Sequence, residues 1–251
     1  MFSGEPVALV TGAGSGIGRA TAARFGDQGC RVAAVDKDEP GLATTLEMLE
    51  SRGIRAIGIR ADVSVESDVQ MAVERTNKEF GSLDFAFNNA GIGGVGKPLH
   101  EHSYDEFITT LNVNLVGVWL CMKYELEVML PQRKGAIVNT ASTLGLMAFA
   151  NVSAYIASKH GVVGLTRAAA VEYAAQGIRV NCVCPGHTRT PINENYWKDH
   201  PEAEAFMLGQ LPVARFGSPD EIAATVTWLC SDDASFVHGH AFAVDGGMTI
   251  V

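Results

Sequence analysis

The segment VALVTGAGSGIGRA, residues 7–20, decides the fold. It places a short apolar run directly before a glycine-rich turn, and the turn leads into a helical pattern. Glycines let the backbone approach a pyrophosphate closely, and a helix start offers free N–H groups with a partial positive charge of about half a unit. The common spacing GxGxxG is not met, so a flexible glycine turn is the alternative interpretation of this segment alone. Its surroundings favour a dinucleotide-binding turn.

Outward from this segment, short apolar runs alternate with longer helical patterns. The runs expected as strands are 7–10, 31–35, 54–59, 83–87, 136–139, 178–183 and 241–244, and the helical patterns lie near 16–28, 39–52, 65–80, 103–130, 153–176 and 218–231. Repeated βα units form a parallel sheet with helices on both faces. We therefore predict an α/β fold, a Rossmann-type doubly wound parallel sheet of about seven strands. No linker or repeat divides the chain, so residues 1–251 are expected to form a single domain.

Composition excludes several classes of protein. The 251 residues carry a formal net charge of -9 with no cluster of Lys and Arg, which argues against a nucleic-acid partner. No apolar run approaches the ~20 residues of a membrane span, and residues 1–10 do not resemble a signal peptide. Five cysteines without a repeating spacing fit a reduced protein, so we expect a cytoplasmic location.

No metal site is expected. Cys182 and Cys184 lie two residues apart on a predicted strand without the spacing of a metal-binding pair, and His238 with His240 resembles a loop more than a zinc site. Buried structural thiols are the favoured interpretation of the two cysteines.

Asp36 ends the second predicted strand, where a ligand crevice of an open α/β sheet is expected. A carboxylate there can accept hydrogen bonds from the adenosine ribose hydroxyls and would repel a 2′-phosphate. Ser15, instead of a basic residue, in the glycine turn also favours NAD. Lys37 keeps NADP open, because an adjacent cation could hold that phosphate. Asp62-Val63 and the run from Asn88 to Gly91 follow the next two strands, although each alone could be a turn.

The motifs of this sequence resemble those of a known family along essentially the whole chain. The residues that carry the resemblance are Thr11, Gly16 and Gly18, Asp62, Asn88-Asn89-Ala90-Gly91, Asn114, Ser142, Tyr155 and Lys159, and Pro185-Gly186 with Thr190. In this order they resemble the short-chain dehydrogenase/reductase family, in its short single-domain branch. The family includes NADP-dependent acyl-carrier-protein ketoreductases, and Asp36 argues against that alternative.

The resemblance implies a set of cofactor contacts and an assembly. Residues implied to bind NAD are Gly12, Ser15, Gly16, Ile17, Gly18, Asp36, Asp62, Val63, Asn89, Ala90, Gly91, Tyr155, Lys159, Pro185, Gly186, Thr188 and Thr190. Asp62 and Val63 would hold the adenine, and Thr188 and Thr190 the nicotinamide carboxamide. A homotetramer, formed through the helices near 103–130 and 153–176 and the C-terminal strand, is expected on the same ground.

Tyr155 and Lys159 are four residues apart on a predicted helix, so their side chains project from one face. An ammonium about 4 Å from the phenol would favour the phenolate by roughly 4 kcal/mol at an effective dielectric near 20. That energy would lower the tyrosine pKa by up to about 3, so Tyr155 is expected to act as a base near neutral pH. A tyrosine and a lysine at this spacing usually lie on a solvated helix face. The residues expected around this pair favour a catalytic role instead.

Ser142 and Asn114 are the expected partners. Ser142 follows the fifth strand, where its hydroxyl could hold the substrate oxygen or merely cap a turn; Thr143 is a possible rival donor. Asn114 lies inside a helix, where Asn is disfavoured, and this suggests a function. By resemblance, it holds a water that links Lys159 to solvent.

The chain is therefore predicted to transfer a hydride between NAD(H) and a secondary alcohol or ketone. Substrate contacts are expected from the loops at 93–99, 144–151 and 187–211, the last forming a lid. Their apolar residues favour a cyclic or otherwise apolar alcohol or diol, and His187 could orient a second oxygen. The alternatives are an NADP-dependent ketoreductase of acyl or sugar substrates, a nucleotide-sensing binding protein, and an epimerase or lyase that uses NAD transiently.

Overall fold

The computed structural model describes residue 2 and residues 4–251, and it contains one seven-stranded parallel sheet. The strands are β1 (Val7–Thr11), β2 (Arg31–Asp36), β3 (Ala56–Arg60), β4 (Phe85–Asn88), β5 (Gly135–Thr140), β6 (Ile178–Pro185) and β7 (Ala241–Val244). Their order across the sheet is β3-β2-β1-β4-β5-β6-β7. The chain winds outward from β1 in both directions, which confirms the predicted doubly wound, Rossmann-type fold.

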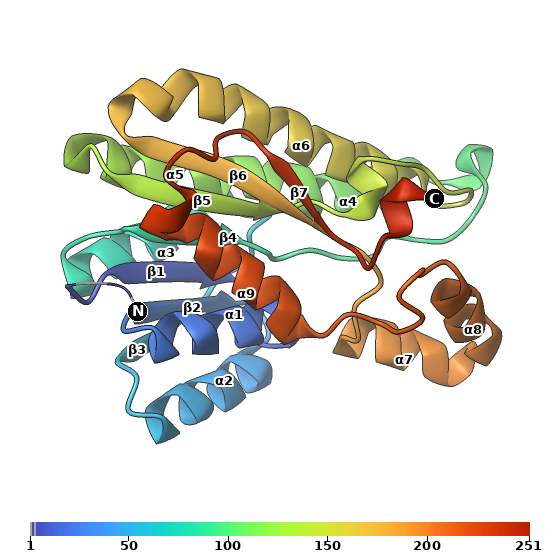
Figure 1. Ribbon diagram of the computed structural model, residues 1–251, viewed down its shortest axis with the longest axis horizontal. Coiled ribbons are helices and arrows are strands. Elements are labelled where there is room, and N and C mark those ends of the chain that lie inside the picture. The colour runs from blue at the N-terminus through green and yellow to red at the C-terminus, as the bar shows by residue number, and fades with distance from the viewer. Residues whose placement is uncertain (1, 3) are drawn as a thin grey trace.

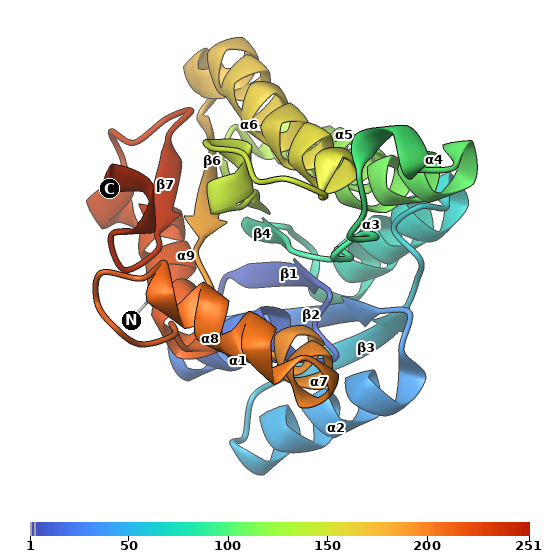
Figure 2. The same cartoon turned by 90° about the vertical axis from the view of Figure 1, so that its right-hand side faces the viewer.

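Helices cover both faces of the sheet (Figures 1 and 2). The longer helices are α1 (Gly16–Asp27), α2 (Glu39–Ser51), α3 (Glu66–Phe80), α4 (Tyr104–Leu111), α5 (Gly117–Gln132), α6 (Ser153–Tyr173), α7 (Pro191–Asp199), α8 (Pro201–Gly209) and α9 (Pro219–Cys230). Helices α1, α2 and α9 pack on one face and α3, α5 and α6 on the other. The packing follows the alternation of strand side chains: Val7 and Leu9 of β1 face one cluster, and Ala8 and Val10 face the other.

Two predicted segments differ from the structure. The helix expected over residues 103–130 is interrupted by a π-helical turn at Asn112–Val116. The segment 187–211 was expected to be a loop, and this is wrong, because it contains α7 and α8. Pro191 and Pro201 stand at the first position of each helix, where proline needs no N–H partner and its fixed φ suits the helix. The prolines therefore start helices instead of breaking them.

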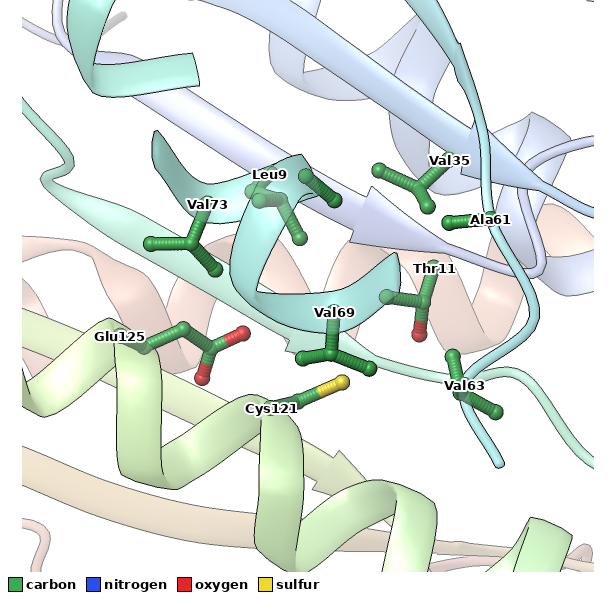
Figure 3. A pocket seen from close by; sticks show the side chains of 10 residues that line it. Leu9, Thr11, Val35, Ala61, Val63, Val69, Val73, Cys121 and Glu125 are labelled. Carbon is green, nitrogen blue, oxygen red and sulfur yellow. The ribbon is translucent and has the colours of Figure 1, made fainter. Parts of the chain in front are cut away.

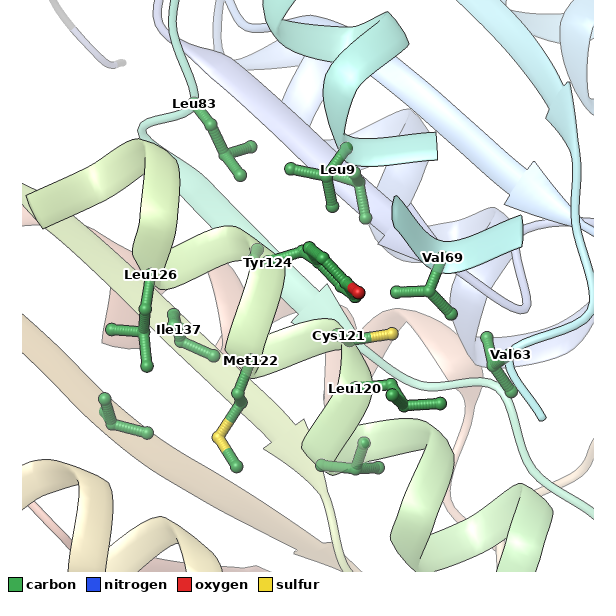
Figure 4. Packing of buried hydrophobic residues seen from close by; sticks show 14 of the residues in the cluster. Leu9, Val63, Val69, Leu83, Leu120, Cys121, Met122, Tyr124, Leu126 and Ile137 are labelled. Atoms are coloured by element: carbon green, nitrogen blue, oxygen red, sulfur yellow. The ribbon is translucent and has the colours of Figure 1, made fainter. Parts of the chain in front are cut away.

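The larger core cluster lies between α5, α3 and the sheet (Figure 4). All five cysteines are buried and free, as expected for structural thiols. Among the described residues, no helix is both long and apolar enough to cross a membrane.

One carboxyl group lies inside this core. Glu125 of α5 is fully buried and accepts a hydrogen bond from Asn88 Nδ2 at 3.0 Å through Oε2, and its Oε1 has no partner. It faces a small apolar cavity beside Val69, Val73 and Cys121 (Figure 3). Burial raises the pKa of Glu125 to about 8, more than the hydrogen bond from Asn88 can offset. The carboxyl group is therefore mostly protonated at neutral pH.

Replacing this carboxyl, Glu125→Gln, is expected to weaken the pH dependence of stability. The folded pKa of about 8 lies above the ordinary value of 4.5, so the folded state binds the proton more tightly than the unfolded chain does. The wild type then loses stability as the pH rises from about 4.5 to about 8, and a glutamine, which cannot ionise, does not. Urea unfolding at several pH values over this range measures the difference.

Glu127→Gln provides the matched control, because Glu127 is exposed on the same helix. Its pH profile should follow the wild type. A Glu125→Gln profile parallel to that of the wild type would show that Glu125 does not hold its proton in the folded protein.

Candidate active site

The carboxyl ends of the parallel strands meet at one edge of the sheet, and the predicted site residues gather there. Figure 1 shows α7 and α8 lying beyond this edge, and Figure 2 views the molecule from that side. In an open α/β sheet, ligands bind at this edge, where the strand order reverses direction. Here the reversal lies between β1 and β4.

The glycine turn after β1 is fixed by the loop that follows β4. The Thr11 hydroxyl oxygen accepts hydrogen bonds from the N–H groups of Asn89 at 2.9 Å and Ala90 at 3.1 Å. Gly12 has a φ of +65°, and a Cβ at Gly18 would overlap the Gly12 carbonyl. Glycine is thus required by the protein's own packing as well as by the proposed approach of a pyrophosphate. The turn leads directly into the N-terminus of α1.

Asp36 reaches back from the end of β2 to this turn. Its Oδ2 accepts from the Gly14 N–H at 2.7 Å, and its Oδ1 accepts from the Asp38 N–H at 2.9 Å. The neighbouring Lys37 instead forms an ion pair with Asp62 at 3.6 Å. Burial acts to raise the pKa of Asp62, but hydrogen bonds from Ser64 and the charge of Lys37 outweigh it and lower that pKa. The cation next to Asp36 is therefore partly neutralised by a carboxylate.

Arg19, in the first turn of α1, is a cation that was not predicted to be a site residue. Its guanidinium donates to the carbonyl oxygens of Gly14 and Gly41, and its Nε donates to Thr45 Oγ1 at 2.9 Å. The feature of the sequence that could have identified Arg19 is a basic residue in the first turn of the helix after the glycine turn. The side chain packs under the glycine turn and ties it to α2.

Lys159 is 3% exposed in the middle of α6, and its ammonium donates to the Thr140 carbonyl at 2.8 Å. The nitrogen lies 5.6 Å from the centre of the Tyr155 ring, one helical turn earlier. Burial lowers the pKa of Lys159 to about 8. The structure thus brings the two residues together as their spacing predicts.

The predicted direction of the tyrosine pKa is wrong for the protein's own groups. Burial raises the pKa of Tyr155, a hydrogen bond with Ser142 acts in the opposite sense, and Cys184 adds to the increase. Desolvation of the phenolate is the largest of these three effects. Without another positive charge nearby, Tyr155 is a protonated donor at neutral pH.

Ser142 is buried at the end of β5, and its hydroxyl oxygen also accepts from the Leu144 N–H at 3.1 Å. It therefore caps the short 3-10 helix Thr143–Gly145 and adjoins Tyr155 as well. Thr143, the rival donor, is 3% exposed.

Asn114 lies in the π-helical turn and is fully buried. Its Oδ1 accepts from the Ile92 N–H at 2.8 Å, and its Nδ2 donates to the Ile92 carbonyl at 2.9 Å and to Ser158 Oγ at 3.3 Å. A Cβ built on Gly91 would lie 3.1 Å from Asn114 Oδ1 and 3.7 Å from Lys159 Nζ. Gly91, Asn114 and Lys159 therefore converge, and widened turns of this kind are frequent at functional sites.

The segment after β6 closes the other side of the crevice. Thr188 is buried and its hydroxyl donates to the Gly186 carbonyl at 3.0 Å. Thr190 precedes α7, and its side chain lies 3.5 Å from a Cβ built on Gly16. The Pro185–Thr190 segment and the glycine turn thus meet at α7.

One nitrogen of the His187 ring, which was expected to orient a second substrate oxygen, is paired within the protein. Its Nε2 hydrogen-bonds to Gln210 Oε1 at 2.8 Å, and burial lowers the pKa of the imidazole, with Gln210 acting in the opposite sense. The ring lines a pocket whose other walls include Leu211, Ile222 and Val244. The imidazole is therefore neutral at physiological pH, and its Nε2 is held by Gln210, directly after α8.

Comparisons with known proteins find relatives along nearly the whole chain. A family model, adh_short_C2, described as enoyl-(acyl carrier protein) reductase, matches residues 12–249. The chain is 42% identical to 2,5-dichloro-2,5-cyclohexadiene-1,4-diol dehydrogenase of Sphingobium indicum, covering 100% of this chain and 99% of the relative. It is 43% identical to cyclohexanol dehydrogenase of an Acinetobacter species, covering 97% and 94%.

A solved structure shows the same fold. The crystal structure of levodione reductase superposes with a TM-score of 0.94 at 40% identity, covering 98% of each chain. The matches run the length of the chain and include the elements that carry Asn114, Ser142, Tyr155 and Lys159. The protein is an oxidoreductase and belongs to the short-chain dehydrogenase/reductase family.

Proposed function

We propose that the protein is an NAD-dependent dehydrogenase that oxidises a secondary alcohol on a ring, or reduces the corresponding ketone. The observation that carries this proposal is the convergence of Tyr155, Lys159, Ser142 and Asn114 beside the glycine turn. The Lys159 ammonium donates a hydrogen bond to the Thr140 carbonyl at 2.8 Å. Lys159 and Asn114 both lie next to Gly91. A binding protein of the same fold would have no need to bury an ammonium beside a phenol.

In the proposed reaction, the protein's residues handle the proton and the substrate oxygen. Tyr155 and the Ser142 hydroxyl hold that oxygen between them. During oxidation the alcohol proton passes to the Tyr155 phenolate, and during reduction the Tyr155 phenol returns it. Lys159 carries a positive charge at neutral pH, because its pKa of about 8 lies above 7. Bound NAD supplies the hydride acceptor, and its positive nicotinamide would oppose the burial that raises the pKa of Tyr155.

Asn114 extends this arrangement away from the substrate. Its side chain is held by Ile92 and Ser158 in a π-helical turn, so its orientation is fixed. We assign it the anchoring of a water that passes the proton between Lys159 and solvent.

The proposal favours NAD over NADP because of the negative charge of Asp36. The Asp36 carboxylate stands beside Gly14, where the adenosine ribose would lie, and it would repel a 2′-phosphate. Lys37 is paired with Asp62. An NADP-dependent ketoreductase is the second candidate, and the presence of Arg19 under the same turn favours it.

The ring alcohol is inferred from two observations. Leu144, Met147 and Phe149 are half-buried in the loop after Ser142, which gives an apolar surface beside the reacting groups. The names of two relatives refer to cyclohexanol and to a cyclohexadiene diol. We also propose a cytoplasmic homotetramer; Val171 of α6 is 85% exposed and would be covered in such an assembly.

Incubation with NAD and a panel of secondary alcohols is expected to produce NADH, with cyclohexanols and cyclic diols turned over faster than open-chain sugars. Tyr155→Phe should lower kcat/KM roughly 10²- to 10⁴-fold, because the proton acceptor is removed. Tyr104→Phe is the control, since Tyr104 is 77% exposed and should behave as the wild type.

The same assay separates the alternatives. Binding of NAD without turnover of any alcohol or ketone would identify a binding protein. Turnover of substrate with no net reduced cofactor would identify an epimerase or lyase.

Asp36→Ala is expected to relax the preference for NAD by tenfold or more, about 1.4 kcal/mol, because the repelling charge is lost. Measuring kcat/KM with NAD and with NADP gives this ratio. Asp36→Asn separates charge from shape, since an amide oxygen can still accept from the Gly14 N–H. A wild type that prefers NADP would overturn the cofactor assignment.

A further inference from the structure

Arg189 lies between Thr188 and Thr190, the two residues that the family resemblance predicts to hold the nicotinamide carboxamide. Its guanidinium carbon lies 5.5 Å from the centre of the Trp197 ring and 5.3 Å from that of Phe216. The two rings stack on each other with centres 4.4 Å apart. Trp197 belongs to α7 and is 4% exposed, and Phe216 follows α8. One arginine thus covers the aromatic contact that joins α7 to the segment after α8.

The charge of Arg189 is shared between the two lid helices. Its Nη1 lies 3.5 Å from Glu194 of α7, and its Nη2 lies 3.0 Å from Glu204 of α8. Single surface ion pairs contribute little, and this side chain is about half exposed. Here, one planar cation contacts two rings and two carboxylates on separate elements. A guanidinium can stack and donate at the same time, which an ammonium cannot.

The backbone around Arg189 is also tied to the segment that follows α8. The Arg189 N–H donates to the Gly217 carbonyl at 2.9 Å, and the Gly217 N–H donates to the His187 carbonyl at 3.0 Å. Asn193 of α7 donates through Nδ2 to the Thr188 carbonyl at 2.8 Å. Residues 187–190 therefore lie between α7 and residues 216–217, and a displacement of either would be transmitted to Thr188.

We propose that Arg189 is a positioning residue that couples the nicotinamide-binding segment to the lid. Its clamp on Trp197, Phe216, Glu194 and Glu204 fixes the orientation of Thr188 and Thr190, so the lid and the carboxamide contacts move as one unit. Arg189 itself touches neither cofactor nor substrate in this role. The inference rests on the proposed function, because it takes Thr188 and Thr190 as contacts of the nicotinamide.

Binding of NADH and of ADP-ribose tests the coupling, because ADP-ribose lacks the nicotinamide. In Arg189→Ala, the Kd for NADH is expected to rise about five- to tenfold, the equivalent of one hydrogen bond, and the Kd for ADP-ribose should change less than twofold. Arg189→Lys keeps the charge but not the stacking, and it should give an intermediate loss. Arg52→Ala is the control, since Arg52 forms an exposed pair with Asp27 at the C-terminal ends of α2 and α1.

A second measurement reports the clamp itself. With Trp119 and Trp228 replaced by Phe, Trp197 is the one remaining tryptophan. Removing Arg189 should increase its quenching by acrylamide severalfold, without cofactor present.

The outcomes separate the two proposals. A wild type that binds neither NADH nor ADP-ribose would overturn the proposed function. If NADH binds and its Kd relative to ADP-ribose is unchanged in Arg189→Ala, the coupling is wrong, and increased quenching of Trp197 would then show that Arg189 only stabilises the lid. A selective loss of NADH affinity together with increased quenching supports the proposal.

Discussion

A single buried ammonium group at the junction of β5 and α6 sets the geometry of the candidate active site. Lys159 is almost completely shielded from water and donates to the Thr140 carbonyl. That hydrogen bond fixes α6 against the end of β5. Tyr155, one turn earlier on α6, and Ser142, two residues beyond Thr140, are then placed beside each other. A buried charge without such a partner would be costly, so the same contact serves the fold and the site.

Much of the fold could be predicted because buried parallel strands leave a clear pattern in a sequence. Each strand after a helix must return in the same direction, which leads to the doubly wound sheet. Local chemistry at the helix ends was harder to interpret. Pro191 indicates a loop when the sequence is considered alone, yet proline is equally suited to the first turn of a helix. The sequence alone does not distinguish these two positions.

The position of the candidate site could also be predicted, since it follows from where the strands end. Its electrostatics could not, because they depend on partners far apart in the chain. Lys37 meets Asp62 and Asp36 meets Gly14 only after folding. The direction of the Tyr155 pKa was wrong for the same reason: the spacing to Lys159 reveals the attraction, but the extent of burial is a property of the whole core.

The core and the site are joined at the end of β4 by two adjacent asparagines. Successive strand residues face opposite sides, so Asn88 turns into the core and hydrogen-bonds to Glu125 and Asn139 at 3.0 Å each, whereas Asn89 faces the glycine turn. The first pairing ties β4 to β5 and α5, and the second ties β4 to Thr11. A polar network inside an apolar core usually costs stability. Here the network lies directly behind the glycine turn. It fixes the end of β4, and Asn89, the next residue, holds the glycine turn in place. This role accounts for the cost in stability.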